Sequence, residues 1–294
     1  GGLIVLFNIF LFSLIAASSH FFELRSFFLL NNNLEFFVFF LGCCFVFAIG
    51  FVDDRQNLSP NLKFLLLSCS ILLLLFFDQT LLIKEINLTF SLKKNIGVYS
   101  YPWTLICFLL FLNAVNMFDG INSQVTLYSI FFLIYLSITT SYTLLCICLI
   151  VGLLFFLLKN FNGKAFLGDS GSYLLAFILA YLSIKSYNKG DIVFADEIVL
   201  LMAVPGIDLM RLFVCRILKK RHPFSPDREH LHHYLLKKFN KVKTILIIQS
   251  IIWVHFFVGY FYKNLIVYLL ISVVLIYGFI ILKIKNNEKD TIHH

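Results

Sequence analysis

Long apolar stretches separated by short polar clusters run along the whole chain. A helix that crosses a membrane needs about 17 to 25 mainly apolar residues, and the pattern predicts about ten such helices. Their expected ranges are Leu3 to Ala17, Leu34 to Val52, Leu62 to Phe77, Tyr101 to Leu112, Val125 to Ile138, Tyr142 to Leu158, Tyr173 to Ile184, Ile198 to Leu218, Ile245 to Phe261 and Leu265 to Leu282. Several are short, so we expect their polar ends to lengthen them. The predicted fold class is an all-α, polytopic membrane bundle.

A different pattern occupies residues 78–100, between the third and fourth expected helices. Apolar and polar side chains alternate there, at Ile83, Glu85, Asn87 and Thr89. This alternation predicts a short strand, and residues near Ile96 to Tyr99 are expected to pair with it as a small β-hairpin. No internal repeat or low-complexity linker interrupts the chain, so residues 1–294 are predicted to form a single domain.

The composition agrees with a lipid-embedded chain. Hydrophobic residues make up 60% of the sequence and charged residues only 14%, whereas soluble domains carry about 25% charged residues. The seven cysteines lie mostly in apolar stretches, where they act as small hydrophobes more often than as metal ligands or disulfides. No charged presequence precedes Gly1, so the first apolar stretch is not expected to be a cleaved signal peptide. A soluble globular protein is excluded.

The distribution of Lys and Arg predicts the orientation in the membrane. With Gly1 in the cytoplasm, the loops after Val52, Leu112, Leu158 and Leu218 and the C-terminal tail lie inside and hold most of these residues. Residues 78–100 then face the periplasm. The net charge of +8 is mainly a topology signal, with attraction of phosphate-bearing substrates or anionic lipid as a second interpretation. Nucleic-acid binding is not expected, because no compact basic domain is present.

Four polar clusters fall on this cytoplasmic side. They are Asp53-Asp54, Asn113 to Asn122, Gly168 to Ser172 and His230 to His233. Ionisable groups beside a bilayer are costly and usually mark a site. The segments 53–63, 113–124, 159–172 and 219–243 are therefore predicted to form one cytoplasmic active site.

The first cluster pairs two carboxylates. Asp53 and Asp54 cannot both ionise cheaply in a partly dry site, so one of them could serve as a base or as a metal partner. The alternative is a structural role, in which Asp54 caps a helix that begins near Ser59-Pro60.

The second and third clusters suit a divalent cation, and the second suits a polar substrate equally. Asn113, Asn116 and Asp119 recur at i, i+3 and i+6, on one face of a helix. The alternative is a row of hydrogen bonds between helices. Asp169 precedes an apolar helix whose N-terminus can receive phosphate, and the alternative there is a plain helix cap by Asp169 or Ser170.

The fourth cluster contains three histidines in a basic loop. His230, His232 and His233 lack the i, i+4 spacing of a helical zinc site. We therefore expect them to be donors for phosphate or ribose. The alternative is a solvated loop attracted to lipid headgroups.

Together these clusters resemble the signature blocks of the polyprenyl-phosphate N-acetylhexosamine-1-phosphate transferases. The matching blocks, in the family's order, are GFVDDRQNLSPNLKF from Gly50, NAVNMFDGIN from Asn113, KAFLGDSGS from Lys164 and PFSPDREHLHH from Pro223. The similarity is greatest to the bacterial branch that starts O-antigen and related surface polysaccharides. Two departures are evident. The family usually has one more helix before the position of Gly1-Gly2, and here Asn122 is followed by Ser123-Gln124 where the family has Gly-Leu.

The resemblance implies transfer of N-acetylhexosamine 1-phosphate from a UDP-sugar to undecaprenyl phosphate, with release of UMP, at the cytoplasmic face of the bacterial inner membrane. It implies Mg²⁺, with Mn²⁺ as the alternative ion, on Asp169 and Asn116. It implies catalytic roles for Asp53, Asp54 and Asp119, the last also lining a uridine pocket with Asn122. The remaining residues that it implies in substrate binding are Lys63, Asn113, Lys164, Arg228, His230, His232 and His233. Pairing of two copies through membrane helices is a further implication.

Two other function classes use the same polar groups differently. A transporter for a sugar nucleotide or a divalent ion should place ionisable groups near mid-membrane and show related halves. Here the acidic residues cluster at the ends of expected helices, and no inverted repeat is visible. A noncatalytic scaffold for glycan assembly is the third class, and substitution of Asp169 separates it from an enzyme.

Overall fold

The computed structural model describes residues 1–18, 33–223, 225 and 227–292. By its internal contacts the chain divides into two compact units. Unit 1 consists of Gly1–Asn87 and Lys93–Val193, and unit 2 consists of Leu88–Leu92 and Phe194–His294. That residues 1–294 act together as one functional domain stays a prediction.

Unit 1 contains seven α-helices among the described residues. They are α1 (Gly2–Ser18), α2 (Asn33–Gln56), α3 (Pro60–Phe77), α4 (Ser100–Phe118), α5 (Gln124–Thr139), α6 (Thr143–Phe161) and α7 (Gly168–Lys189). Short 3-10 helices η3 (Gln79–Leu81) and η4 (Gly97–Tyr99) lie between α3 and α4. Each α-helix grows from one of the apolar stretches, because a helix satisfies its own backbone hydrogen bonds where no water can do so.

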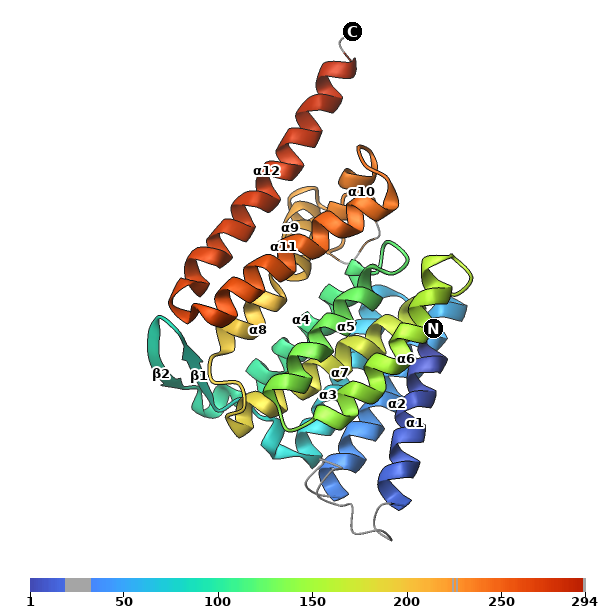
Figure 1. The fold of residues 1–294 in the computed structure, drawn as a ribbon, viewed down its shortest axis with the longest axis vertical. Helices are drawn as coiled ribbons and strands as arrows, with labels where there is room; N and C mark the ends of the chain where they lie inside the picture. The colour runs from blue at the N-terminus through green and yellow to red at the C-terminus, as the bar shows by residue number, and fades with distance from the viewer. Residues whose placement is uncertain (19–32, 224, 226, 293–294) are drawn as a thin grey trace. The chain divides into compact units, whose positions relative to one another are not determined.

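Helix α7 is the centre of unit 1. It packs against α1, α2, α4 and α5 (Figure 1), and every residue from Ser170 to Ser186 is buried. The ring of Phe177 stacks on Phe39 from α2 and on Phe108 from α4, with centroids 6.4 and 5.9 Å apart. Gly50 allows close approach of α2, because a Cβ there would lie 2.5 Å from the Cα of Ser170. Small residues at such contacts let membrane helices pack tightly.

The far end of α7 is anchored by buried charge. Lys185 Nζ lies 2.5 Å from Asp78 Oδ2, and both side chains are buried. One turn further, Lys189 Nζ donates to the hydroxyl of Tyr142, which itself donates to Glu35 Oε1 over 2.5 Å. Because these charges pair with one another, the end of α7 opposite Gly168 is fixed in place.

The predicted β-hairpin is confirmed, but its second strand begins earlier than expected. Strand β1 (Glu85–Leu88) pairs with β2 (Ser91–Asn95). The expected partner near Ile96 to Tyr99 is wrong, because η4 occupies Gly97–Tyr99. Asn95 Oδ1 accepts a hydrogen bond from the backbone N–H of Gly97, whose φ of 58° is left-handed. This Asx turn ends the strand.

Unit 2 contains five α-helices among its described residues. They are α8 (Ala195–Leu201), α9 (Ala203–Leu218), α10 (Leu231–Leu236), α11 (Lys241–Phe261) and α12 (Ile266–Ile292), with η5 (Lys263–Leu265) before the last. The predicted continuous segment Ile198 to Leu218 is instead a broken span, in which α8 and α9 meet at 72°. Pro205 accounts for the break, because it has no N–H to bond the carbonyl of residue 201 and its ring clashes there.

The chain is a multi-pass membrane protein. Among the described residues, six helices are long and apolar enough to span a membrane, or seven if the bent α8–α9 pair counts as one. Each of the ten predicted ranges coincides largely with helix, but a count of ten spans is not confirmed. Helices α1 and α5 have only 17 and 16 residues, so they are shorter than the six. Helix α7 has 22 residues, but its polar first turn and its two lysines make it less apolar.

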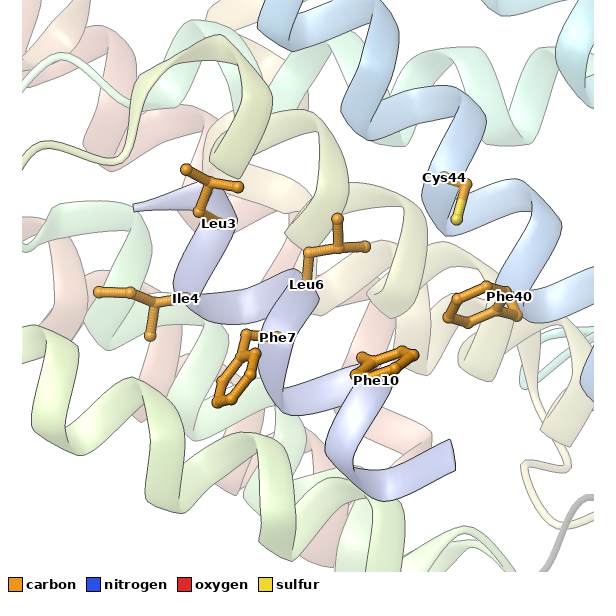
Figure 2. A pocket seen from close by; sticks show the side chains of 7 residues that line it. All are labelled: Leu3, Ile4, Leu6, Phe7, Phe10, Phe40 and Cys44. Carbon is orange, nitrogen blue, oxygen red and sulfur yellow. The ribbon is translucent and has the colours of Figure 1, made fainter. Parts of the chain in front are cut away.

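One apolar groove opens on the surface of unit 1. Figure 2 shows its lining, which comes from α1 and α2 and consists of Leu3, Ile4, Leu6, Phe7, Phe10, Phe40 and Cys44. Its volume is ≈ 560 Å³. Leu3 and Phe7 are more than half exposed, as is normal for side chains that face lipid rather than water.

Candidate active site

The corner between α2 and α3 holds the first carboxylate. Asp53 is 4% exposed, its Oδ1 accepts from the backbone N–H of Leu58 over 2.8 Å, and its Oδ2 lies 2.6 Å from Lys63 Nζ. Ser59 caps α3 by accepting from the N–H of Leu62, and Pro60 follows at the first helical position. The predicted helix start at Ser59-Pro60 is thus confirmed. Because Lys63 sits one turn into α3, the cap places its ammonium beside the buried carboxylate.

Asp54 has a different partner, the N-terminus of α7. Its Oδ1 accepts from the N–H of Asp169 over 2.7 Å and its Oδ2 from the N–H of Ser170 over 3.1 Å. Gly168 makes this possible, since its φ is 71° and a Cβ would lie 2.8 Å from Asp54 Oδ2. A carboxylate at this end of a helix satisfies free N–H groups and suits the helix dipole. Asp54 therefore caps α7. The sequence had suggested Asp54 as a cap of α3 and Asp169 or Ser170 as the cap of α7.

Asp169 lies where three other helices converge on the first turn of α7. Its Oδ1 accepts from Asn116 Nδ2 over 3.0 Å, and its Oδ2 is 3.7 Å from Lys63 Nζ. Asn116, on α4, also donates to Ser172 Oγ over 2.8 Å. The structure thus brings Asp53, Lys63, Asn116 and Asp169 together within unit 1.

Asp119 ends α4 and adds a further carboxyl group to this cluster. Burial, together with the nearby carboxylates of Asp169 and Asp54, raises its pKa to about 7. A group with such a pKa changes its protonation near neutral pH, which is what acid–base chemistry and proton donation to a ligand require.

The donor set fits Mg²⁺. Within the described residues, no group of three or more His, Cys, Asp or Glu could hold a metal ion by itself. Mg²⁺ does not need such a cage, because it commonly takes one or two carboxylates together with phosphate oxygens of the substrate. Asp169 offers a carboxylate whose side chain is 37% exposed. Asn116 orients that carboxylate by donating to it, so its predicted place as a direct ligand stays a prediction.

The other predicted residues of unit 1 lie around this cluster. Asn113 donates its amide N–H to the carbonyl of Leu109 one turn earlier on α4. Asn122 lies in the turn before α5 and faces the loop after α6, since a Cβ on Gly163 would lie 3.9 Å from its Nδ2. Lys164 is exposed in the same loop. Their predicted contacts with substrate stay predictions.

Asn160 is a residue that the sequence reasoning missed. It is buried in the last turn of α6, its Oδ1 accepts from the N–H of Ser123 over 2.6 Å, and its Nδ2 donates to the carbonyl of Ala165 over 2.8 Å. One amide therefore joins the two loops that carry Asn122 and Lys164. The signal was an amide at the end of an apolar helix, next to Lys159. Ser123 itself has φ 81°, the left-handed conformation that explains glycine at this position of the family pattern.

The three histidines meet within unit 2. The ring of His230 stacks on that of His232, with centroids 5.2 Å apart and planes at 13°, and His233 lies 4.3 Å from His232 by centroid. His230 Nδ1 lies 2.9 Å from Asp208 Oδ2. Arg228 is exposed just before them. Phe224 and Pro226 of the same motif lie outside the described residues.

Two of the three histidines, His232 and His233, have a lowered pKa and are neutral at pH 7. Burial, together with the neighbouring His230 and His233, lowers the pKa of His232 to about 3. Burial and His230 also lower the pKa of His233. His232 Nε2 is buried and has no hydrogen-bond partner among the described residues. Such an atom suits contact with a ligand or a bound water.

The loop that carries the histidines is braced by a buried arginine. Arg216 is 4% exposed, its Nε donates to Asp227 Oδ2 and its Nη1 to the carbonyl of Pro223, both over 2.7 Å. Asp227 in turn accepts from the N–H of Glu229 over 2.9 Å. Arg216 thus ties Pro223 and Asp227 of this loop to α9.

Comparisons with known proteins agree with these motifs. A family model described as glycosyl transferase family 4 matches residues 36–187. An undecaprenyl-phosphate alpha-N-acetylglucosaminyl 1-phosphate transferase of Thermotoga maritima is 33% identical over 218 residues, covering 72% of this chain and 66% of the relative. Proteins of the same name from Escherichia coli (strain K12) and Yersinia pestis are each 26% identical, covering 67% and 72% of this chain and 58% and 62% of the relatives. The chain thus spans about three fifths to two thirds of these relatives' length.

Proposed function

The chain belongs to glycosyl transferase family 4, and we propose that it transfers N-acetylhexosamine 1-phosphate from a UDP-sugar to undecaprenyl phosphate, releasing UMP. The observation that carries this proposal is the meeting of Asp53, Lys63, Asn116 and Asp169 from four helices of unit 1. The names of the relatives supply the acceptor and favour N-acetylglucosamine as the sugar.

In this reaction an oxygen of the lipid phosphate forms a bond to the β-phosphorus of the UDP-sugar. The bond from that phosphorus to the bridging oxygen breaks, and UMP leaves with the electron pair. Both reactants are anions, so the site must neutralise charge and align them. Lys63, held between Asp53 and Asp169, supplies a fixed positive charge. When bound, Mg²⁺ would neutralise charge on the pyrophosphate, with Asp169 as its protein ligand.

The acceptor hardly needs a general base. A phosphate monoester has a second pKa near 6 and is largely ionised at pH 7. Asp53 is engaged with Lys63 and Leu58, and Asp54 is engaged with the N-terminus of α7. We therefore assign to both an orienting role. Asp119, with a pKa of about 7, can present a protonated carboxyl to a carbonyl oxygen of the uracil ring.

The charge distribution and the family indicate the membrane and the side of it on which the reaction would take place. The excess of Lys and Arg in the loops that carry the motifs favours a cytoplasmic site at the bacterial inner membrane. The step would be the first membrane step of a surface polysaccharide such as O-antigen. Neutral histidines at His232 and His233 would contact phosphate or sugar through single N–H donors, with Arg228 supplying charge. Pairing of two copies stays a prediction.

The test is UMP release by the purified chain with undecaprenyl phosphate, Mg²⁺ and a panel of UDP-sugars. We expect release with one sugar only, dependent on the lipid, and lost in Asp169→Asn and with chelator. Asp191→Asn is the matched control, because Asp191 is an exposed carboxylate just beyond the opposite end of α7. Release that survives Asp169→Asn, or a folded chain that releases no UMP with any sugar, would contradict the proposal and favour a transporter or a scaffold.

A further inference from the structure

We propose that Asp208 is a positioning residue that fixes the ring of His230 for the transfer reaction, and that Tyr277 and Arg211 hold Asp208 in place. This inference rests on the proposed function, because that function gives His230 a part in binding the substrate. All four residues lie outside the range 36–187 that the family model matches. The inference therefore brings the last helix of the chain, α12, into the catalytic apparatus.

Asp208 is a buried carboxylate on α9 with both oxygens occupied. It is 4% exposed. Its Oδ2 faces His230 Nδ1 at 2.9 Å, and its Oδ1 accepts from the backbone N–H of Leu231 over 3.1 Å and from the hydroxyl of Tyr277 over 2.5 Å. A buried charge is tolerated only when hydrogen bonds and an opposite charge satisfy it. Three separate elements, α9, α10 and α12, converge to do so here.

Arg211 completes this arrangement from the next turn of α9. Its Nη2 lies 3.1 Å from Asp208 Oδ1 and also donates to the carbonyl of Glu229, while its Nε donates to the hydroxyl of Tyr277 over 2.5 Å. The Tyr277 hydroxyl thus accepts from Arg211 and donates to Asp208. Tyr277 is 3% exposed, so water does not compete for these bonds. The carboxylate has one position only.

A carboxylate in this position determines which nitrogen of His230 carries the proton. The Nδ1–H must point at Asp208, which leaves Nε2 to face away from it. Carboxylates that hold catalytic or metal-binding histidines act in the same way, by setting the tautomer and the ring angle. Because His230 stacks on His232, the fixed ring also sets the position of its neighbour, whose buried Nε2 has no partner in the described part of the chain.

The experiment compares Asp208→Asn and Tyr277→Phe in the full chain. Asn keeps the size of the side chain but offers an N–H where His230 needs an acceptor, and Phe removes only the hydroxyl. Tyr268→Phe is the matched control, because Tyr268 is 69% exposed on the same helix. The readouts are kcat and KM for the UDP-sugar, and the ¹⁵N shifts of the His230 ring, assigned by difference from His230→Gln.

We expect Asp208→Asn to lower kcat/KM by about 10- to 100-fold, the size of one lost hydrogen bond to a charged group. The ¹⁵N signal of His230 should move away from the Nδ1-protonated form. Tyr277→Phe should change both readouts in the same direction by a smaller amount, and Tyr268→Phe should change neither.

A purely structural network would give a different result. Variants that melt at lower temperature, yet keep the kcat/KM of the folded enzyme and the ¹⁵N signature of His230, would overturn the inference. Failure of the proposed function is seen separately, as a wild-type chain without UMP release. In that case a His230 ring that stays Nδ1-protonated in Asp208→Asn would still overturn the positioning role.

Discussion

Two substitutions of Asp54 distinguish a structural role of this residue from a chemical one. In the structure it caps α7 by accepting from the N–H groups of Asp169 and Ser170. Asp54→Ala removes both acceptors, whereas Asp54→Asn keeps one oxygen acceptor of the same reach and loses the charge. We expect Asp54→Asn to lower transferase activity much less than Asp54→Ala.

The magnitudes follow from the two hydrogen bonds and the charge. Replacing a helix cap by Ala costs about 0.5 to 2 kcal/mol, and loss of a negative charge at a helix N-terminus costs about 0.3 to 1 kcal/mol. Asp54→Ala should therefore lower the free energy of unfolding by about 1 to 3 kcal/mol, and Asp54→Asn by less than about 1 kcal/mol. The effect on rate is larger for Ala, because Asp169 lies in the freed turn and a shift of about 1 Å at a reacting centre costs about 100-fold.

The assay is initial UMP release at saturating lipid acceptor, together with thermal unfolding of each variant in the same detergent. Asp54→Asn should keep kcat within about tenfold of wild type, and Asp54→Ala should fall about 100-fold. Gly168→Ala tests the same contact from the other side, since a Cβ there meets Asp54 Oδ2. It should behave like Asp54→Ala.

A general base at Asp54 would give a different pattern. Removing a base costs about 10²- to 10⁴-fold whether Asn or Ala replaces it. Equal and severe losses of kcat in Asp54→Asn and Asp54→Ala, with both variants folded, would refute the capping role as the explanation.

Three further predictions concern stability, measured by unfolding of the purified chain. Ser123→Gly should raise the free energy of unfolding by about 0.5 to 1 kcal/mol, because φ 81° strains a residue with a Cβ; no gain would show that the Asn160 contact already offsets the strain. Lys185→Met should lower the free energy of unfolding by about 3 to 5 kcal/mol, because it leaves Asp78 buried without its partner. The double variant with Asp78→Leu should recover most of this loss. An equal loss in the single and double variants would disprove this prediction. Folding lowers the pKa of His232 from 6.5 to about 3. The stability linked to this residue is fully present above pH 6.5. The free energy of unfolding declines as the pH drops toward 3, because the unfolded chain then binds a proton that the folded chain does not. His232→Gln should flatten that decline, and an unchanged slope would count against it.

The membrane helices could be predicted because each depends on a local run of apolar residues. The break between α8 and α9 was also within reach, since Pro205 sits inside the predicted segment. The pairing of Asp54 with the N–H groups of residues 169 and 170 was not, because it joins positions 115 residues apart. Hydrophobic spacing carries no information about which helix end a distant carboxylate will reach.

Some residues of the candidate site could likewise be predicted from the sequence, and others could not. The motifs indicated that Asp53, Asn116 and Asp169 should converge, and the structure brings them together. Asp208 and Tyr277 escaped notice because neither belongs to one of the four polar clusters that the sequence shows between its apolar stretches. Tyrosine in particular is typical of lipid-facing belts at the membrane surface. Only the tertiary packing of unit 2 shows that Tyr277 is buried against a carboxylate.

The complete burial of α7 from Ser170 to Ser186 has a consequence for how the protein responds to its surroundings. Bilayers differ in thickness, and helices in contact with acyl chains tilt to match them. Because α7 touches other helices along this whole length, such tilting reaches Asp169 only after α1, α2, α4 or α5 has shifted. The carboxylate cluster is therefore insulated from the physical state of the lipid, and membranes of different thickness should support the same geometry around Asp169.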